Sequence, residues 1–332
     1  MHDTQLTDRF GRAHTYLRIS VTDRCNLRCR YCMPGDTNRW ADSGDLLSDE
    51  EVVLLAKLFA SLGVTKIRLT GGEPTVRPGI EQLVERLTHI SGVSVVAMTT
   101  NGTRLRDKAQ SLRSAGLTAL NISLDTLRRD RFRKITGRDR LVDVLAGIDH
   151  ALAADFLPLR INTVVIRNVN DDELIDLVQF TKVRRVCVRF IEYMPSQSAT
   201  VPSAELLSYQ EMLRCIESRF ELKPVWSSSE LVSNVAKEFS IDGHLGTIGF
   251  ITPMTNHFCD RCNRLRLTAD GRLKTCLFYP AELNLRDALR GGVGSQEMVS
   301  MIQAAFRGKA ESPPLADRII SANEPGMFSV GG

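Results

Sequence analysis

Apolar and polar residues alternate along six short segments of this chain, and longer stretches with helical spacing separate them. The alternating segments cover residues 16–21, 64–70, 93–99, 117–124, 157–166 and 185–191. Strands that alternate with helices predict a parallel sheet, because parallel neighbours need a long crossover connection. Eight such units close a full barrel, so six units predict an α/β fold with a partial, open TIM-like (βα)6 barrel.

Local signals mark two of the helices between these strands. Ser48, followed three residues later by Glu51, forms a capping-box pattern, and Gly63 predicts the end of that helix. Pro78 marks the start of the next helix, where apolar residues recur at helical spacing over residues 80–90. Each helix therefore has one apolar face to bury against the sheet.

The predicted strands carry an unusually polar set of residues on one face. Alternate positions on the other face are apolar, as in Leu17, Ile19 and Val21. If helices cover the apolar face, the polar set lines the barrel interior. Unpaired buried arginines are costly, so we expect an aqueous cavity for an anionic ligand. The polar set comprises Tyr16, Arg18, Ser20, Lys66, Arg68, Thr70, Asn121, Ser123, Asp125, Arg160 and Asn162.

An alternative is that interior acids pair with these arginines. The candidate acids are Asp125, Glu192 and Glu73. Each of them lies in or beside a turn that follows a strand, at the rim where ligand sites gather in parallel α/β folds. Gly71 and Gly72 would let the backbone approach a ligand at this rim, and Glu73 could accept hydrogen bonds from an amine.

Composition and charge exclude several classes of protein. The 332 residues are 25% charged and 43% hydrophobic, which is ordinary for a globular protein. The net charge of +4 is spread along the chain, which gives no reason to expect nucleic acid as a partner. No apolar stretch approaches the about eighteen residues of a membrane span, and the polar N-terminus is unlike a signal peptide. We therefore expect a cytoplasmic protein with no membrane partner.

Six of the eight cysteines form two sets of three. Closely spaced cysteines in a reducing compartment more often bind metal or do chemistry than form disulfides. Cys187 and Cys215 lie in apolar and helical patterns, where we expect small buried side chains. Structural zinc sites need four protein ligands, so three thiols favour a 4Fe-4S cluster with one iron open to a small molecule. The sets are Cys25, Cys29 and Cys32, in C-x3-C-x2-C spacing, and Cys259, Cys262 and Cys276, in C-x2-C-x13-C spacing.

The first cysteine set, with Tyr31 before its third cysteine and GGEP at 71–74, resembles the radical S-adenosylmethionine superfamily. The resemblance implies that the methionine part of S-adenosylmethionine binds the open iron. One-electron reduction would then release methionine and a 5'-deoxyadenosyl radical. It also implies cosubstrate contacts from Tyr31, Gly72, Ser123 and Met194.

The segment NHFCDRCNRLRLTADGRLKTC, residues 256–276, resembles the signature of the GTP 3',8-cyclases of molybdenum-cofactor biosynthesis, and the similarity runs over nearly the whole chain. This resemblance implies a second 4Fe-4S cluster on Cys259, Cys262 and Cys276, whose open iron binds the guanine of GTP. Position 160 is usually lysine in the family. Arg160 therefore places a planar guanidinium with several N–H donors where the family has a compact ammonium. The implied GTP contacts are Arg18, Arg68, Thr99, Arg160, Arg264, Leu265 and Arg266.

The resemblance also implies a reaction, a lyase-type cyclisation that begins molybdopterin biosynthesis. The radical would take the ribose 3' hydrogen, and the resulting carbon radical would attack C8 of guanine to give 3',8-cyclo-7,8-dihydro-GTP. No residue is identified as the proton donor. The implied partners are GTP, an electron donor such as a flavodoxin-type reductant, and the cyclic pyranopterin monophosphate synthase that receives the product; a monomer and a homodimer both fit.

This resemblance also implies a division of the chain into three parts. Residues 1–200 would form the partial barrel, and residues 201–309 a smaller C-terminal α+β domain that covers its open side and holds the second cluster. Residues 310–332 would form a tail whose terminal Gly331 and Gly332 reach into the barrel.

Two other functions stay open at the level of the sequence. One is a radical enzyme with an auxiliary cluster that modifies a peptide or RNA, although peptide-modifying relatives usually have more C-terminal cysteines and no basic stripe favours RNA. The other is a non-enzymatic zinc or electron-carrier protein. Iron content and a requirement for S-adenosylmethionine separate these functions.

Overall fold

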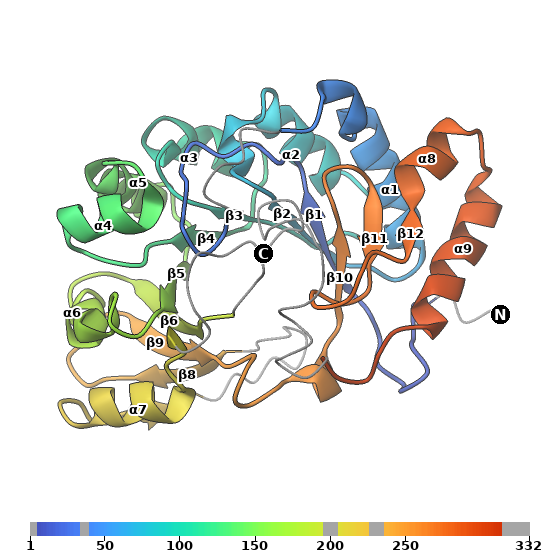
Figure 1. Ribbon diagram of the computed structural model, residues 1–332. Helices are drawn as coiled ribbons and strands as arrows, with labels where there is room; N and C mark the ends of the chain where they lie inside the picture. Colours follow the sequence, from blue (N-terminus) through green and yellow to red (C-terminus); the bar gives the residue numbers. More distant parts are fainter. Residues whose placement is uncertain (1–4, 34–39, 195–204, 226–235, 314–332) are drawn as a thin grey trace.

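A computed structural model describes residues 5–33, 40–194, 205–225 and 236–313. One sheet of twelve strands organises them, in the order β12-β11-β10-β1-β2-β3-β4-β5-β6-β9-β8-β7 (Figure 1). The strands are β1 (Tyr16–Ser20), β2 (Lys66–Thr70), β3 (Val95–Thr100), β4 (Ala119–Ser123), β5 (Leu159–Val165), β6 (Val186–Glu192), β7 (Lys223–Pro224), β8 (Lys237–Ser240), β9 (Thr247–Ile251), β10 (Arg264–Leu267), β11 (Arg272–Lys274) and β12 (Leu283–Asn284).

The predicted partial barrel is confirmed, and the C-terminal third extends it at both edges. The six expected strands pair in parallel from β1 to β6. β10 pairs in parallel with β1, with Tyr16 opposite Arg264, and β9 pairs in parallel with β6. Short antiparallel strands continue each edge, and the sheet stays open between β7 and β12. The sequence did not predict that the C-terminal strands join the barrel sheet.

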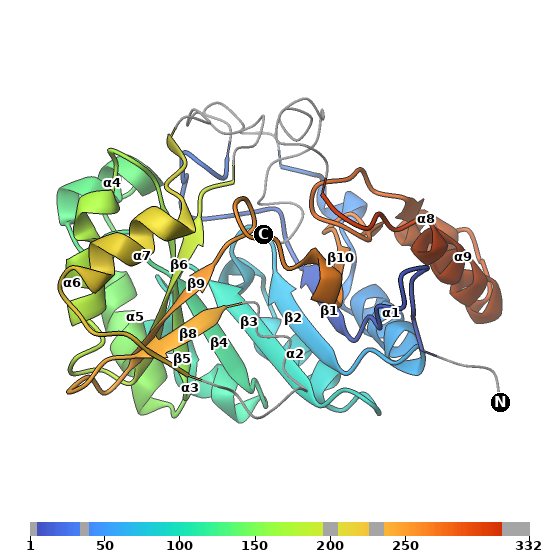
Figure 2. The ribbon, with the colours of Figure 1, turned by 90° about the horizontal axis from the view of Figure 1, so that it is seen from below.

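Helices cover the outer face of the sheet (Figures 1 and 2). Leu17, Ile19 and Ile67 are fully buried beneath them, which leaves the polar strand face inside the barrel. Within the described residues, no helix is long and apolar enough to cross a membrane. The α-helices are α1 (Asp49–Ser61), α2 (Ile80–Thr88), α3 (Leu105–Ser114), α4 (Arg129–Thr136), α5 (Leu141–Ala153), α6 (Leu174–Gln179), α7 (Tyr209–Glu217), α8 (Leu285–Arg290) and α9 (Ser295–Arg307).

The helix boundaries follow the local sequence signals. Ser48 caps α1, and its side chain accepts a hydrogen bond from Glu51 N while the Glu51 carboxylate accepts one from Ser48 N, so the predicted capping box is confirmed. The apolar face of α2, including Ile80 and Leu87, is fully buried. Both helices therefore dock through the faces that periodicity identified.

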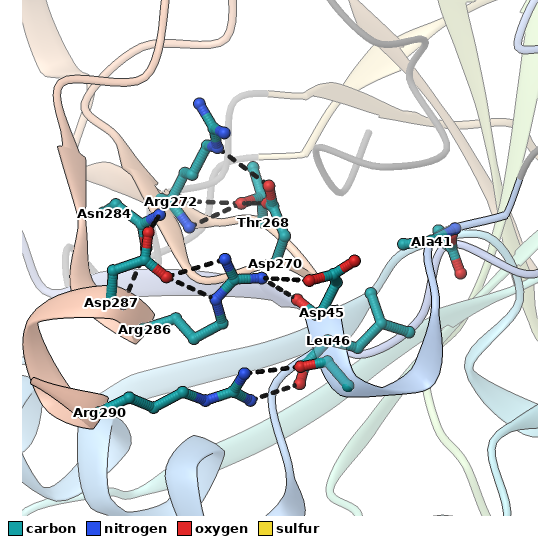
Figure 3. Close-up of polar contacts among 12 residues, drawn as sticks. Ala41, Asp45, Leu46, Thr268, Asp270, Arg272, Asn284, Arg286, Asp287 and Arg290 are labelled. Atoms are coloured by element: carbon teal, nitrogen blue, oxygen red, sulfur yellow. Dashed lines mark hydrogen bonds and ion pairs between the residues drawn. The ribbon is translucent and has the colours of Figure 1, made fainter.

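Polar contacts join α8 to the start of α1 and to the connection between β1 and α1 (Figure 3). Arg290 Nε lies 2.6 Å from Glu51 Oε1, and Arg290 Nη2 donates to Leu46 O at 3.0 Å. Arg286 Nη1 donates to the backbone carbonyl of Asp45. These contacts fix α8, which follows the edge strand β12, against α1 and the segment before it.

Candidate active site

A single cavity on the inner face of the sheet gathers seven basic side chains. They come from five strands, β1, β2, β5, β6 and β10, whose inward faces meet at this cavity. No carboxylate lines this cavity within the part of the chain that the structure describes. Arg189 Nη2 also lies 2.5 Å from Glu238 Oε1, a carboxylate outside the cavity lining. The basic residues are Arg18, Lys66, Arg68, Arg160, Arg189, Arg264 and Arg266.

The three interior acids bind backbone and hydroxyl groups. Glu73 accepts hydrogen bonds from Thr100 Oγ1 at 2.5 Å and from Asn101 N at 2.6 Å. Asp125 accepts one from Val164 N at 2.9 Å, and Glu192 accepts one from Tyr209 N at 2.9 Å. The expectation that these acids pair with the interior arginines is therefore not supported. Glu73 is fully buried and ties two turns together.

Burial and mutual repulsion make the cavity cations costly. Burial lowers the pKa of Arg266 to about 10, and neighbouring Arg264 adds to this lowering. Burial likewise lowers the pKa of Arg160 to about 10, with Arg189 and Arg68 adding to the effect. Crowded, desolvated guanidiniums are most stable beside an anion, and their fork geometry suits phosphate oxygens. The cavity is therefore suited to a polyanionic ligand.

Six of the seven expected GTP contacts line this cavity, and one does not. Leu265 is fully buried on the opposite face of β10, so only its backbone could approach a ligand. Lys66 and Arg189 line the cavity but were not expected as ligands. Their signal was present, because both follow the same alternation of inward positions along their strands. The residues placed as expected are Arg18, Arg68, Thr99, Arg160, Arg264 and Arg266.

The second cysteine set lies in the wall of the same cavity, in the loops that flank β10 and β11. Cys262 N donates to Cys259 O at 3.2 Å in a tight turn. Burial, with repulsion from Cys262 and Cys276, raises the pKa of Cys259 to about 11. A thiol in this environment becomes a thiolate when a cationic metal group binds it. The set is Cys259, Cys262 and Cys276.

The first cysteine set lies in the loop after β1, packed against α4. Arg28 N donates to Thr136 O at 2.7 Å and Arg30 N to Ile135 O at 3.0 Å. Burial, followed by repulsion from Cys25 and Asp125, raises the pKa of Cys32 to about 12. Asn101 Nδ2 lies 3.8 Å from Cys25 Sγ, and Thr99, two residues earlier, lines the cavity. The loop therefore lies at the rim of the basic cavity.

Among the described residues, no three His, Cys, Asp or Glu side chains converge closely enough to hold one metal ion. Within each set the thiols still influence one another electrostatically. Three soft thiols in each set suit an iron-sulfur group, whereas a structural zinc site takes four protein ligands.

Three of the four expected cosubstrate contacts lie in the first set, against its loop or in the cavity lining. Tyr31 Oη donates to Asp125 Oδ2 at 2.7 Å. A Cβ on Gly72 would lie 2.2 Å from Arg24 O, so only glycine permits this approach to the cysteine loop. Ser123 ends β4, and Met194 lines the cavity.

Cys187, Cys215 and the two terminal glycines are the remaining residues with an expectation from the sequence. Cys187 is buried, as expected, but Cys215 is exposed because it lies on the outer side of α7. Its helical spacing indicated an apolar face, but that face is filled by Met212 and Ile216. Gly331 and Gly332 lie outside the described residues.

Comparison with known proteins gives two family matches. Residues 19–181 match the Radical SAM superfamily, and residues 186–313 match Molybdenum Cofactor Synthesis C. "GTP 3',8-cyclase, mitochondrial" of Arabidopsis thaliana is 45% identical over 98% of this chain and 83% of its own length. "GTP 3',8-cyclase" of Listeria monocytogenes is 41% identical over 98% of this chain and 99% of its own length.

Other relatives are longer or more distant. "Molybdenum cofactor biosynthesis protein 1" of Homo sapiens is 46% identical over 98% of this chain, which spans 49% of that protein. The solved structure of Streptococcus suis SuiB bound to S-adenosylmethionine superposes with a TM-score of 0.61 at 13% identity, covering 93% of this chain and 75% of SuiB, and supports the fold alone. On the full-length similarity to the plant and bacterial cyclases, the chain belongs to the GTP 3',8-cyclase family of the radical SAM superfamily.

Proposed function

We propose that this chain converts GTP into 3',8-cyclo-7,8-dihydro-GTP with S-adenosylmethionine as cosubstrate, the first step of molybdopterin biosynthesis. The observation that carries the proposal is the cavity, where seven basic side chains and no described carboxylate lie beside the second cysteine set. A triphosphate supplies an anion that suits these cations, and a purine can reach the thiol wall. The relatives named as GTP 3',8-cyclases share this whole chain.

Membership of the radical SAM superfamily implies a 4Fe-4S cluster and S-adenosylmethionine. We assign that cluster to Cys25, Cys29 and Cys32, with the cosubstrate near Tyr31, Gly72, Ser123 and Met194. When bound and reduced, it supplies the 5'-deoxyadenosyl radical that takes the ribose 3' hydrogen. The chain's own task is to hold ribose and sulfonium in register, and Asn101 and Thr99 join the first cysteine set to the cavity.

A second 4Fe-4S cluster on Cys259, Cys262 and Cys276, also with three protein ligands, is part of the proposal. Its support is that all three thiols line the cavity that the arginines line. In this arrangement the guanine lies toward the thiols, and the triphosphate lies toward the basic residues of β2, β5 and β6. The open iron would then be available to the guanine.

The basic residues of the cavity fall into two groups according to the strand that carries them. Lys66, Arg68, Arg160 and Arg189 come from β2, β5 and β6, and we assign them to the triphosphate. Arg160, in place of the family lysine, can bind phosphate through two parallel N–H donors. Arg18, Arg264 and Arg266, from β1 and β10, lie nearer the second cysteine set, with Thr99 at the rim and the Leu265 backbone between two of them.

The remaining expectations belong to the same proposal. A flavodoxin-type reductant would deliver the electron, and the cyclic pyranopterin monophosphate synthase would take the product, in the cytoplasm, with the chain as a monomer or homodimer. The domain division at 200/201 and 309/310 is kept as a proposal. The two family matches meet between residues 181 and 186, beside β6. Gly331 and Gly332 would support catalysis, and their removal should lower activity without removing iron.

The test is anaerobic turnover of reconstituted protein with S-adenosylmethionine and GTP, alongside iron analysis. We expect a GTP-dependent product, and loss of it in Cys25→Ala and in Cys259→Ala, each with about half of the iron because each variant disrupts one of the two proposed clusters. The matched control is Cys215→Ala, because Cys215 is an exposed cysteine outside both sets. This variant should keep both the GTP-dependent product and the full iron content. Cleavage of S-adenosylmethionine that GTP leaves unchanged, with no GTP product, would instead favour a peptide or RNA substrate.

A further inference from the structure

Lys309 lies immediately beyond α9, yet it is only 2% exposed. Its Nζ donates to Thr275 O at 2.6 Å and to Arg264 O at 3.1 Å, and it lies 4.0 Å from Cys262 Sγ. The ammonium therefore contacts one thiol of the second cysteine set and the backbone directly before Cys276.

All three partners of this Nζ are acceptors. A neutral amine has two N–H bonds, so the geometry fits the charged ammonium with three donors. Within the described residues, no carboxylate lies within ion-pair distance of Lys309. Asp8 acts on Lys309 only from beyond contact distance. A buried ammonium with no carboxylate in contact is costly, which points to an anion that belongs at this place.

Arg12 is a second buried cation near Lys309. Unlike Lys309, it has a carboxylate in contact, and it helps to hold Lys309 in position. Arg12 is 9% exposed, and its Nε lies 2.7 Å from Asp8 Oδ2, so its charge is compensated. Arg12 Nη1 donates to Cys259 O at 2.7 Å, and Nη2 donates to Ala310 O at 2.8 Å. Arg12 thus clamps the residue after Lys309 to the loop of the second cysteine set.

We propose that Lys309 is the counter-cation and positioning residue of the second iron-sulfur cluster. The inference rests on the proposed function, in which Cys259, Cys262 and Cys276 hold a 4Fe-4S cluster. Such a cluster with three thiolates is a net anion, and its reduction adds negative charge. A nearby ammonium that also donates toward a ligand sulfur stabilises the reduced form and raises the reduction potential.

The test isolates the second cluster by placing variants in a Cys25→Ala, Cys29→Ala, Cys32→Ala background. Lys309→Met removes the charge at similar length, and Lys309→Arg restores it. Lys108→Met is the control, because Lys108 pairs with Glu81 at 2.5 Å on the outer helices. The readouts are iron and sulfide per chain, and a redox titration followed by electron paramagnetic resonance. Lys309→Gln serves if the methionine variant proves unfolded by circular dichroism.

We expect the midpoint potential to move to a more negative value in Lys309→Met, or the second cluster to be lost from that folded variant, while Lys309→Arg and Lys108→Met stay near the parent. Folded Lys309→Met with the parent's iron content and potential would overturn the role of Lys309 alone. A parent background that binds no iron would overturn the second cluster itself, and this role with it. The complementary background, with only Cys25, Cys29 and Cys32, should show no change on Lys309→Met.

Discussion

Tyr16 lies among four basic side chains at the start of β1. Burial raises its pKa, but Arg68, Arg18 and Lys66 outweigh this and lower it to about 7. Arg68 Nε donates to Tyr16 Oη, and Lys66 Nζ lies 4.8 Å from the centroid of the ring. The phenolate is thus the preferred form above neutral pH while no anion occupies the cavity.

Tyr16→Phe should therefore remove an ultraviolet tyrosinate titration near pH 7 from the reconstituted protein. GTP should move this titration to higher pH, because its phosphates neutralise the cations that favour the phenolate. A pH series of difference spectra, with and without GTP, measures both effects. Identical titrations for the parent and Tyr16→Phe would contradict the assignment.

His14 is fully buried, and neither ring nitrogen has a hydrogen-bond partner in the described structure. Burial lowers its pKa from 6.5 to about 4, and Lys309 contributes. The unfolded chain therefore binds a proton first as pH falls. Stability is fully present above pH 6.5 and is lost as pH falls through the folded pKa, by at most about 3 kcal/mol.

Urea unfolding between pH 7 and 4 checks this expectation. His14→Phe cannot titrate, so its free energy of unfolding should fall less steeply over this interval than that of the parent. His89→Gln, which alters an exposed histidine, should keep the parent slope. Parallel curves for His14→Phe and the parent would show that His14 titrates normally.

The turn after β2 and the first cysteine loop form one unit. Glu73 N donates to Arg24 O at 2.8 Å, and Gly72 packs so closely that a side chain would meet the same carbonyl. We expect Gly72→Ala to displace the loop and to reduce both iron on the first set and binding of S-adenosylmethionine. Gly44→Ala is the control, since a Cβ there meets nothing within 4 Å.

Iron analysis in a Cys259→Ala background, combined with equilibrium binding of S-adenosylmethionine, reads out this effect on the first set alone. The second set lies on other loops and should retain its iron when Gly72→Ala is made in the full chain. Normal iron and normal binding in both proteins would show that the loop adapts.

Periodicity predicted where the strands and helices lie in the sequence, but it did not predict which strands pair in the sheet. The six strands of residues 16–192 and the capping box at Ser48 are local patterns, and each appears where it was expected. The pairing of β10 with β1 joins residues that are far apart in the chain, and no short-range pattern encodes it. The same limit hid Arg12 and Lys309, which act through distant backbone carbonyls and a thiol.

The inward-facing arginines were predictable for a different reason. Alternation along a strand fixes which side chains share a face, so the sequence pattern alone identifies Arg18, Arg68 and Arg160 as inward-facing. Lys66 was expected on this inward face but not as a ligand, and Arg189, which obeys the same alternation, was not named at all. Leu265 shows the converse, because its place in a motif suggested contact while its strand position puts its side chain in the core.

At the scale of the molecule, the sheet topology brings the two cysteine sets, which are more than 200 residues apart in the sequence, to one cavity. β1 leads into the first cysteine loop, and its parallel neighbour β10 follows directly after Cys259 and Cys262. Tyr16 N donates to Asn263 O at 3.2 Å across this seam. A substrate held between the two cysteine sets would therefore lie along β1, above the basic strand face.

The central claim is that this arrangement takes the 3' hydrogen from GTP. The most direct measurement is anaerobic turnover with GTP deuterated at the ribose 3' position, followed by mass spectrometry of the 5'-deoxyadenosine formed. We expect deuterium in the 5'-deoxyadenosine, and none when the label lies elsewhere on the ribose. Unlabelled 5'-deoxyadenosine, formed equally without GTP, would contradict it.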